Sequence, residues 1–398
     1  MRRVPSRFIV FGLLAFALSG AAQNESINWV LRQFPDGGNV PFVALPADAE
    51  AGITALVDYV QGRTNGLDLE ALSGLITFIR ANYTNSTPWR PEDRWGAEAA
   101  AAMTELPVDL QTRAELVFDP RVPDHVKLPN LLRYSTIEDM EAFDRAYTAC
   151  VRSMPATDGF AHGVYLCTEE TTPNLQSSAY YAYTNIRTLV RVRIDGQDAL
   201  FSFASMYAPS SVSRRGAPIG SHDNGVYFYS DRTGIGVTGV TWVESQMYIG
   251  NMLSAYVALD SNTTAQCIIS WVNAGWRGVN VTRAAHIHTV LQRTMRDIKQ
   301  QASHPDVTVE RLAAIMADVD ALSDEEVDRE FGHYADFVRK RVKQDGGGLW
   351  SLVTSTPLQS IFSEGELTNM PMRYRRAIVA QERVRALMET PTWSVGLE

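Results

Sequence analysis

The chain has 398 residues, of which 45% are hydrophobic, 20% charged and 10% aromatic, values close to the averages of globular proteins. This composition argues against a disordered, collagen-like or polytopic membrane protein and allows roughly two to three domains or one large core. With 36 basic and 45 acidic residues the net charge is −9. Nucleic acid is therefore not expected as a partner, because its affinity rests on neutralisation of phosphates by Lys and Arg.

The first 22 residues have the pattern of a secretory signal peptide. Arg2, Arg3 and Arg7 precede an apolar run over 8–18, and small residues follow it, which is the order of charged region, apolar region and cleavage site. The apolar run is too short to cross about 30 Å of hydrocarbon. We therefore expect removal of residues 1–22, no stable membrane span afterwards, and a periplasmic or secreted protein.

Residues 23–158 are predicted to form a helical N-terminal region. Apolar spacing predicts two helices early in this region, a proline in a first turn predicts a third, and periodicity predicts a fourth; they cover 53–60, 72–79, 91–106 and 137–151. The intervening segment 107–133 is rich in Pro and Asp. It is expected to be an extended connection.

Three cysteines occur in the chain, and export would place them in a compartment that permits disulfides. Cys150 and Cys167 flank a short segment with turn signals, whereas Cys267 lies in an apolar run. The sequence predicts a Cys150–Cys167 disulfide and a buried, unreactive Cys267 thiol.

Residues 159–278 are predicted to form an antiparallel β region. The clearest unit is a hairpin around Asp195-Gly196, a dipeptide typical of two-residue turns. This turn places Arg193 opposite Asp198, a favourable cross-strand pair, and puts six apolar side chains on one face (Val190, Val192, Ile194, Ala199, Phe201 and Phe203). Further strands are predicted over 226–230, 236–243, 247–259 and 265–272. The spacing between them leaves no room for helical crossovers, so an antiparallel sheet is expected.

The segment 207–225 is longer than an ordinary hairpin loop, and long loops in compact domains are often functional. Arg214 and Arg215, next to Ser211 and near several glycines, could hold an anionic group. A second interpretation is a hydrolase in which His222 acts as the base, with Ser213 and Asp223 as weak candidates for the other catalytic roles. A third is a solvated loop without a ligand.

Residues 279–398 are predicted to form a helical C-terminal region. Helical stripes run over 284–298, 309–319 and 327–338, and a last helix is predicted over 371–388. His286 and His288 point about 200° apart on such a helix, so no metal site is predicted there. Five arginines of the last helix could contact an anionic partner, but a solvated helix face is favoured for them in an acidic protein (Arg373, Arg375, Arg376, Arg383 and Arg385).

The sequence thus predicts an α+β fold in which N-terminal and C-terminal helices cover a largely antiparallel sheet. No common cofactor or metal motif is present, and no cofactor is expected. The leading hypothesis is an exported protein that binds an unidentified small molecule or protein, with an anionic ligand favoured by the loop 207–225. The alternatives are a secreted hydrolase that uses His222 and a structural protein of the cell envelope. Convergence of the loop residues in a concave pocket would favour a ligand site over the structural protein.

Overall fold

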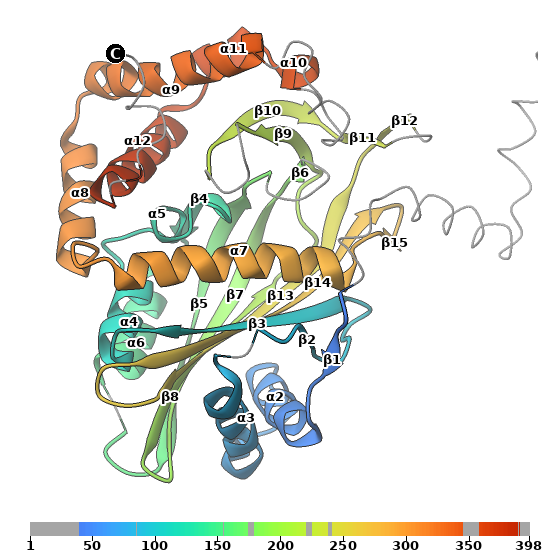
Figure 1. Ribbon diagram of the computed structural model, residues 1–398, viewed down its shortest axis with the longest axis vertical. Coiled ribbons are helices and arrows are strands. Elements are labelled where there is room, and N and C mark those ends of the chain that lie inside the picture. Colours follow the sequence, from blue (N-terminus) through green and yellow to red (C-terminus); the bar gives the residue numbers. More distant parts are fainter. Residues whose placement is uncertain are drawn as a thin grey trace, which may run out of the picture.

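The computed structural model describes residues 40–84, 86–153, 155–173, 179–219, 225–237, 241–344, 358–388 and 390. The predicted signal peptide lies outside these residues. The chain has the predicted α+β fold: helices cover both faces of a large, mostly antiparallel sheet (Figure 1). Among the helices of the described ranges, none has the length and apolar character needed to cross a membrane.

The main sheet has the strand order β1-β2-β3-β14-β13-β8-β7-β5-β4, and β15 pairs with β14. Only the short β1–β2 pair is parallel among the described ladders. The strands are β1 (Val43–Ala44), β2 (Trp89–Arg90), β3 (Glu98–Leu106), β4 (Leu132–Ile137), β5 (Gly159–Thr171), β7 (Ala182–Ile194), β8 (Gln197–Met206), β13 (Gln246–Ala258), β14 (Thr264–Trp276) and β15 (Val279–Asn280).

The hairpin predicted around Asp195-Gly196 is confirmed as β7–β8. Both turn residues have positive φ, 50° and 72°, as a two-residue turn matched to the strand twist requires. Arg193 lies opposite Asp198 and forms two hydrogen bonds with its carboxylate, both 3.0 Å long. The predicted register is therefore correct.

A smaller sheet stands above the main one (Figure 1) and has the order β10-β9-β6. Its strands are β6 (Ala179–Tyr180), β9 (Arg214–Pro218) and β10 (Tyr227–Thr233), and a separate pair is formed by β11 (Ile235–Val237) and β12 (Thr241–Val243). The segment 207–225 is thus not a continuous loop, because β9 lies within it. Pairing of β9 with both β6 and β10 fixes the backbone at the two arginines.

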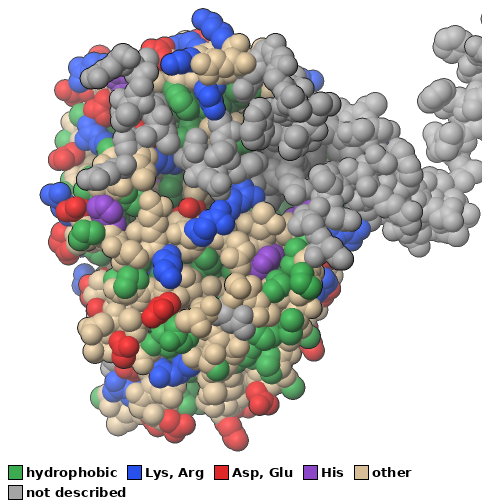
Figure 2. All heavy atoms as spheres, viewed as in Figure 1, with side chains coloured by type: hydrophobic (Ala, Val, Ile, Leu, Met, Phe, Trp, Pro, Cys, Tyr) green, Lys and Arg blue, Asp and Glu red, His purple; other side chains and the backbone are tan. Residues whose placement is uncertain are grey.

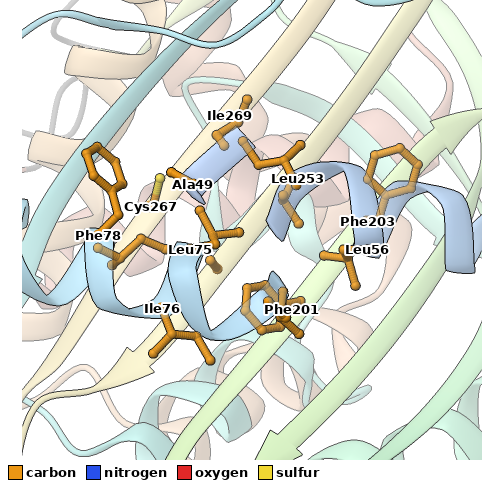
Figure 3. Close-up of a cluster of buried hydrophobic side chains, with 14 of the residues drawn as sticks. Ala49, Leu56, Leu75, Ile76, Phe78, Phe201, Phe203, Leu253, Cys267 and Ile269 are labelled. Atoms are coloured by element: carbon orange, nitrogen blue, oxygen red, sulfur yellow. The ribbon is translucent and has the colours of Figure 1, made fainter. Parts of the chain in front are cut away.

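Two helices, α2 (Ala47–Val60) and α3 (Leu69–Asn82), cover one face of the main sheet. Figure 3 shows their apolar side chains meeting those of β8, β13 and β14. The cluster includes Leu56, Leu75, Phe201 and Leu253, each at most 1% exposed. Asp68 caps α3, its side chain accepting a hydrogen bond from the Ala71 amide.

The opposite face is covered by α7 (Ala284–Ser303), α4 (Leu110–Phe118), α6 (Met140–Tyr147) and the single π-helical turn η1 (Thr148–Arg152). A second group of helices gathers at one end of the molecule beside β9 and β10 (Figure 1). It comprises α5 (Asp124–Lys127), α8 (Val309–Ala321), α9 (Asp324–Gln344), α10 (Leu358–Ile361), α11 (Glu364–Thr368) and α12 (Met372–Leu387). These elements share a second apolar core with β9 and β10.

Two predictions for the N-terminal region are wrong. The Ala-rich segment predicted as a helix over 91–106 contains the strand β3, which lies between two helical layers: Ala99 and Ala101 face α2 and α3, whereas Ala100 and Ala102 face α7. The segment 107–133, predicted to be extended, contains α4 and α5. The region 23–158 is consequently not purely helical, because β3 and β4 belong to the main sheet.

The structure contradicts the predicted Cys150–Cys167 disulfide: all three cysteines are buried free thiols. The Cys150 thiol lies 3.6 Å from the carbonyl oxygen of Leu189, to which it donates. Leu189 pairs with Gly163 of β5, and Gly163 is four residues from Cys167. At about 3.3 Å per residue this places the two cysteines roughly 13 Å apart along the strand, too far for a disulfide.

Candidate functional site

A cleft of about 720 Å³ lies where the edge strand β4 meets the small sheet and the C-terminal helices. We call it the β4 cleft. Strands β4, β5, β6, β9 and β10 form its walls together with residues of α11 and α12 (Arg133, Tyr134, Thr136, Thr168, Glu170, Tyr180, Ala182, Ser211, Arg214, Tyr229, Asp231, Thr233, Glu366, Met370, Pro371, Arg373 and Tyr374). Its lining therefore combines tyrosines, hydroxyl groups and charges of both signs.

Arg133 lies in the wall of this cleft inside a cage of aromatic rings. Its guanidinium carbon is 3.8 Å from the ring centre of Tyr374 and 4.3 Å from that of Tyr229, distances at which a cation is attracted to the ring face. Its Nη1 donates to Glu170 at 2.6 Å, and the Tyr374 hydroxyl donates to the same carboxylate at 2.7 Å. Burial lowers the pKa of Arg133, but Glu170 and nearby tyrosines outweigh it and raise the pKa overall. Arg133 therefore stays charged, and the carboxylate of Glu170 balances its charge within the protein.

Arg373, the second residue of α12, is an exposed cation of the cleft. Its guanidinium carbon lies 4.7 Å from the ring centre of Tyr374, and its Nη2 donates to the Tyr374 hydroxyl at 3.3 Å. That hydroxyl donates to Glu170, so a chain of hydrogen bonds holds Arg373 at the cleft. Unlike the four later arginines of α12, it has no carboxylate partner among the described residues; those four pair with Asp328, Asp324, Glu330 and Glu382.

Arg214 of β9 contributes a second accessible guanidinium, with 42% of its side chain exposed. It lies 3.4 Å from the carboxylate of Asp231, which is itself 79% exposed, so the pair is weakly held in water. Glu366 occupies the same side of the cleft and accepts hydrogen bonds from the Ser230 hydroxyl and the Asp231 amide. Burial raises the pKa of Glu366, so this carboxyl group is protonated more readily than an exposed one, which reduces its repulsion of an incoming anion.

The predicted loop residues do not converge as a group. Ser211 and Arg214 line the β4 cleft, but Arg215 and Ser213 do not. Neighbouring residues of a strand point to opposite faces, and Arg215 is accordingly only 7% exposed. Ser213 is fully buried and accepts a hydrogen bond from the Ser245 hydroxyl at 2.8 Å. His222 and Asp223 lie outside the described residues.

The sequence did not indicate the roles of Arg133, Tyr374 or Arg373. Arg373 was recognised only as one of five arginines on a helix face. What distinguishes it is that it forms no direct ion pair with a carboxylate of the described residues and is linked to Glu170 through the Tyr374 hydroxyl. The signal that could have found it is its position: it stands beside Tyr374 in the first turn of α12. Three of the other four arginines pair with carboxylates of α9, and the fourth pairs with Glu382 of α12 itself.

A second cleft of about 460 Å³ shares Tyr134, Thr136 and Arg373 with the β4 cleft. Its lining includes His125 of α5, whose ring stacks on Tyr134 with centroids 5.1 Å apart. Burial lowers the pKa of His125 to about 4, so the ring is neutral at pH 7. Arg373 therefore stands at the junction of two clefts, and the imidazole that lines the second cleft adds no positive charge at pH 7.

The groups that line the β4 cleft are suited to binding an anion. Guanidinium and hydroxyl donors can hold a carboxylate, phosphate or sulfate group. Within the described ranges, no three or more His, Cys, Asp or Glu side chains are grouped so as to hold a metal ion. His286 and His288 both lie on α7, where their spacing directs them apart.

Comparisons with known proteins give little guidance. No model of a known protein family matches the sequence, and no curated protein matches it significantly. Among solved structures, the chain is similar to the crystal structure of human STARD10, with 7% sequence identity and a TM-score of 0.26 over 52% of this chain and 63% of that one. The chain therefore matches less than two thirds of that protein, and a similarity this low carries no argument about its function.

Proposed function

We propose that the protein is an exported binding protein whose ligand carries an anionic group held in the β4 cleft by Arg373 and Arg214. The observation that carries this proposal is the state of Arg373, an exposed guanidinium without a carboxylate partner among the described residues, held by Tyr374 at a cleft of about 720 Å³. Clefts of about 300–1,000 Å³ with a few convergent polar groups are typical of small-molecule sites.

Charge and geometry support an anion as the recognised group. On the face seen in Figure 2, acidic and basic side chains are interspersed and form no large patch of one sign. Attraction for an anion would consequently come from local groups rather than from the net charge of −9. Arg373 and Arg214 lie in different walls of one cleft, which allows one ligand to accept hydrogen bonds from both.

Binding of citrate, sulfate and inorganic phosphate, with glucose as a neutral probe, tests the proposal by titration calorimetry. We expect saturable 1:1 binding of at least one anion and a loss of about tenfold or more in Arg373→Gln, because a charge-assisted hydrogen bond contributes about 1.5–3 kcal/mol. Arg214→Gln should weaken binding less, because Asp231 already competes for that side chain. Arg145→Gln is the matched control, an exposed arginine of α6 paired with Glu141.

Equal affinities in Arg373→Gln and Arg145→Gln would contradict the proposed site. Failure of all three anions to bind would favour the structural envelope protein considered from the sequence. Export is part of the proposal and rests on the pattern of residues 1–22 alone.

A further inference from the structure

An apolar strip lies uncovered on the outer part of the main sheet. Phe160, Val164 and Leu166 of β5 are 37%, 46% and 38% exposed. They alternate with inward residues of the same strand, so their side chains share one face. Ile186 of β7 lies opposite Leu166 and is half-buried. We call these four residues the β5 strip.

The β5 strip occupies the same sheet face as α2 and α3 but lies beyond them. Phe160 pairs with Val192 of β7, and Val192 belongs to the apolar core beneath the two helices. Tyr59 of α2 reaches β5 itself, where its ring contacts Phe160 and its hydroxyl is 2.8 Å from His162. His162 faces the same way and separates Phe160 from Val164, so the contiguous part of the strip is Val164, Leu166 and Ile186. Exposed apolar surface of this kind commonly marks a binding site.

The strip continues directly into the β4 cleft. Thr168 and Thr184 pair across β5 and β7, their hydroxyl oxygens 3.0 Å apart, so both point to one face. Thr168 lines the cleft, and the next pair along the same face is Leu166–Ile186. The pair after it includes Val164, roughly 13 Å from Thr168 at about 3.3 Å per residue.

We infer that the ligand is a single-chain anionic amphiphile, with its charged head at Arg373 and its hydrocarbon chain along the β5 strip. The inference rests on the proposed function, since it adds a tail to the anion held in the β4 cleft. Two features select this class together: accessible guanidinium groups at one end of a continuous surface, and exposed Val and Leu side chains at the other. A small hydrophilic anion would leave the strip in water, and a neutral apolar molecule would leave Arg373 without a partner.

Titration with a series of alkanoates tests the inference, from butanoate to dodecanoate, each below its micelle-forming concentration. Affinity should rise by roughly two- to fourfold per added methylene over the part of the series that reaches Val164, as expected for partial to full burial of each group. Val164→Thr with Leu166→Thr should flatten this dependence while keeping side chains suited to a strand. Val43→Thr is the matched control, because Val43 is 45% exposed on β1 at the far edge of the sheet.

The outcomes separate the inference from the proposed function. Binding that depends on Arg373 but not on chain length would overturn the amphiphile and keep the anion site. A chain-length dependence unchanged in the double variant would place the tail elsewhere and also overturn it. Binding only to vesicles of phosphatidylglycerol, with no monomeric alkanoate bound, would indicate a membrane surface instead of a single-chain ligand. If Arg373→Gln changed the affinity for none of the probes, the result would contradict both the proposed anion site and the amphiphile.

Discussion

Arg187, one of the buried arginines of β7, offers a sharp test of how the main sheet holds α5. Arg187 is 7% exposed and donates to Asp124 at 2.6 Å and to Glu169. Asp124 also pairs with Lys127 at 3.2 Å, and Glu169 accepts from Asn185 at 2.8 Å. Replacement of Arg187 by Met keeps much of the side-chain volume and removes the charge, so the buried Glu169 and the half-buried Asp124 lose their shared partner. We expect a loss of about 3–5 kcal/mol of unfolding free energy at pH 7.

The loss should shrink as the pH falls. Burial raises the pKa of Asp124, but the charges of Lys127 and Arg187 outweigh it and lower the pKa to about 2. Because this value lies below that of the unfolded chain, about 3.9, the wild-type protein loses the Asp124 contribution between about pH 4 and pH 2. Burial raises the pKa of Glu169, and removal of Arg187 raises it further. Protonation then relieves the uncompensated charges in the variant.

Urea denaturation followed by tryptophan fluorescence at pH 7, 5 and 3 measures these differences. Arg145→Met, an exposed i,i+4 pair with Glu141 on α6, should change stability by at most about 0.5 kcal/mol. Glu169→Gln in the Arg187→Met background should recover about 1 kcal/mol or more, because one orphaned charge is gone. A loss below about 1 kcal/mol at pH 7, or a difference that grows on acidification, would refute the reasoning.

Two further predictions concern tight packing and export. A Cβ on Gly163 would lie 2.4 Å from the Cα of Ala146, so Gly163→Ala should destabilise the protein by about 2 kcal/mol or more by forcing α6 off β5. Gly332 of α9 has open space around it, so Gly332→Ala should instead stabilise the protein by about 0.5–1 kcal/mol. Equal effects of the two substitutions in denaturant titrations would contradict this reading of the α6 contact. The intact mass of the exported protein should lack about the first 22 residues, and a retained Met1 would exclude cleavage.

The sequence predicted those elements whose cause is local. The β7–β8 register follows from the turn at Asp195-Gly196 and from alternation of side chains, both of which can be read over a short stretch. The start of α9 also has a local cause, a capping box in which Ser323 and Glu326 exchange hydrogen bonds of 2.8 and 3.3 Å. Neither depends on what packs against it.

The β4 cleft could not be predicted because its parts come from distant segments. Arg133 belongs to an edge strand, Glu170 to its neighbour, and Tyr374 and Arg373 to the last described helix. Each residue type is common on a protein surface, and only the fold brings the two arginines onto the ring of one tyrosine. Likewise, Arg214 and Arg215 are adjacent in sequence, but strand pairing sends one to the cleft and the other into the interior.

The strand β3 shows how packing overrides local propensity, and it allows that explanation to be tested. Alanine favours helices, yet β3 is flanked by helices on both faces, and Ala100 is fully buried beneath α7 with Ile287 and Leu291. If small side chains are needed there to let α7 approach, Ala100→Val should destabilise the protein by about 1–2 kcal/mol through overpacking. Valine favours strands more than alanine does, but the whole scale of strand propensity spans only about 1 kcal/mol, so overpacking should outweigh this gain. Glu105→Thr on the same strand raises strand propensity at a half-buried position and should change stability by at most about 0.5 kcal/mol. Stabilisation by Ala100→Val in thermal and urea unfolding would show that the space beneath α7 does not select alanine.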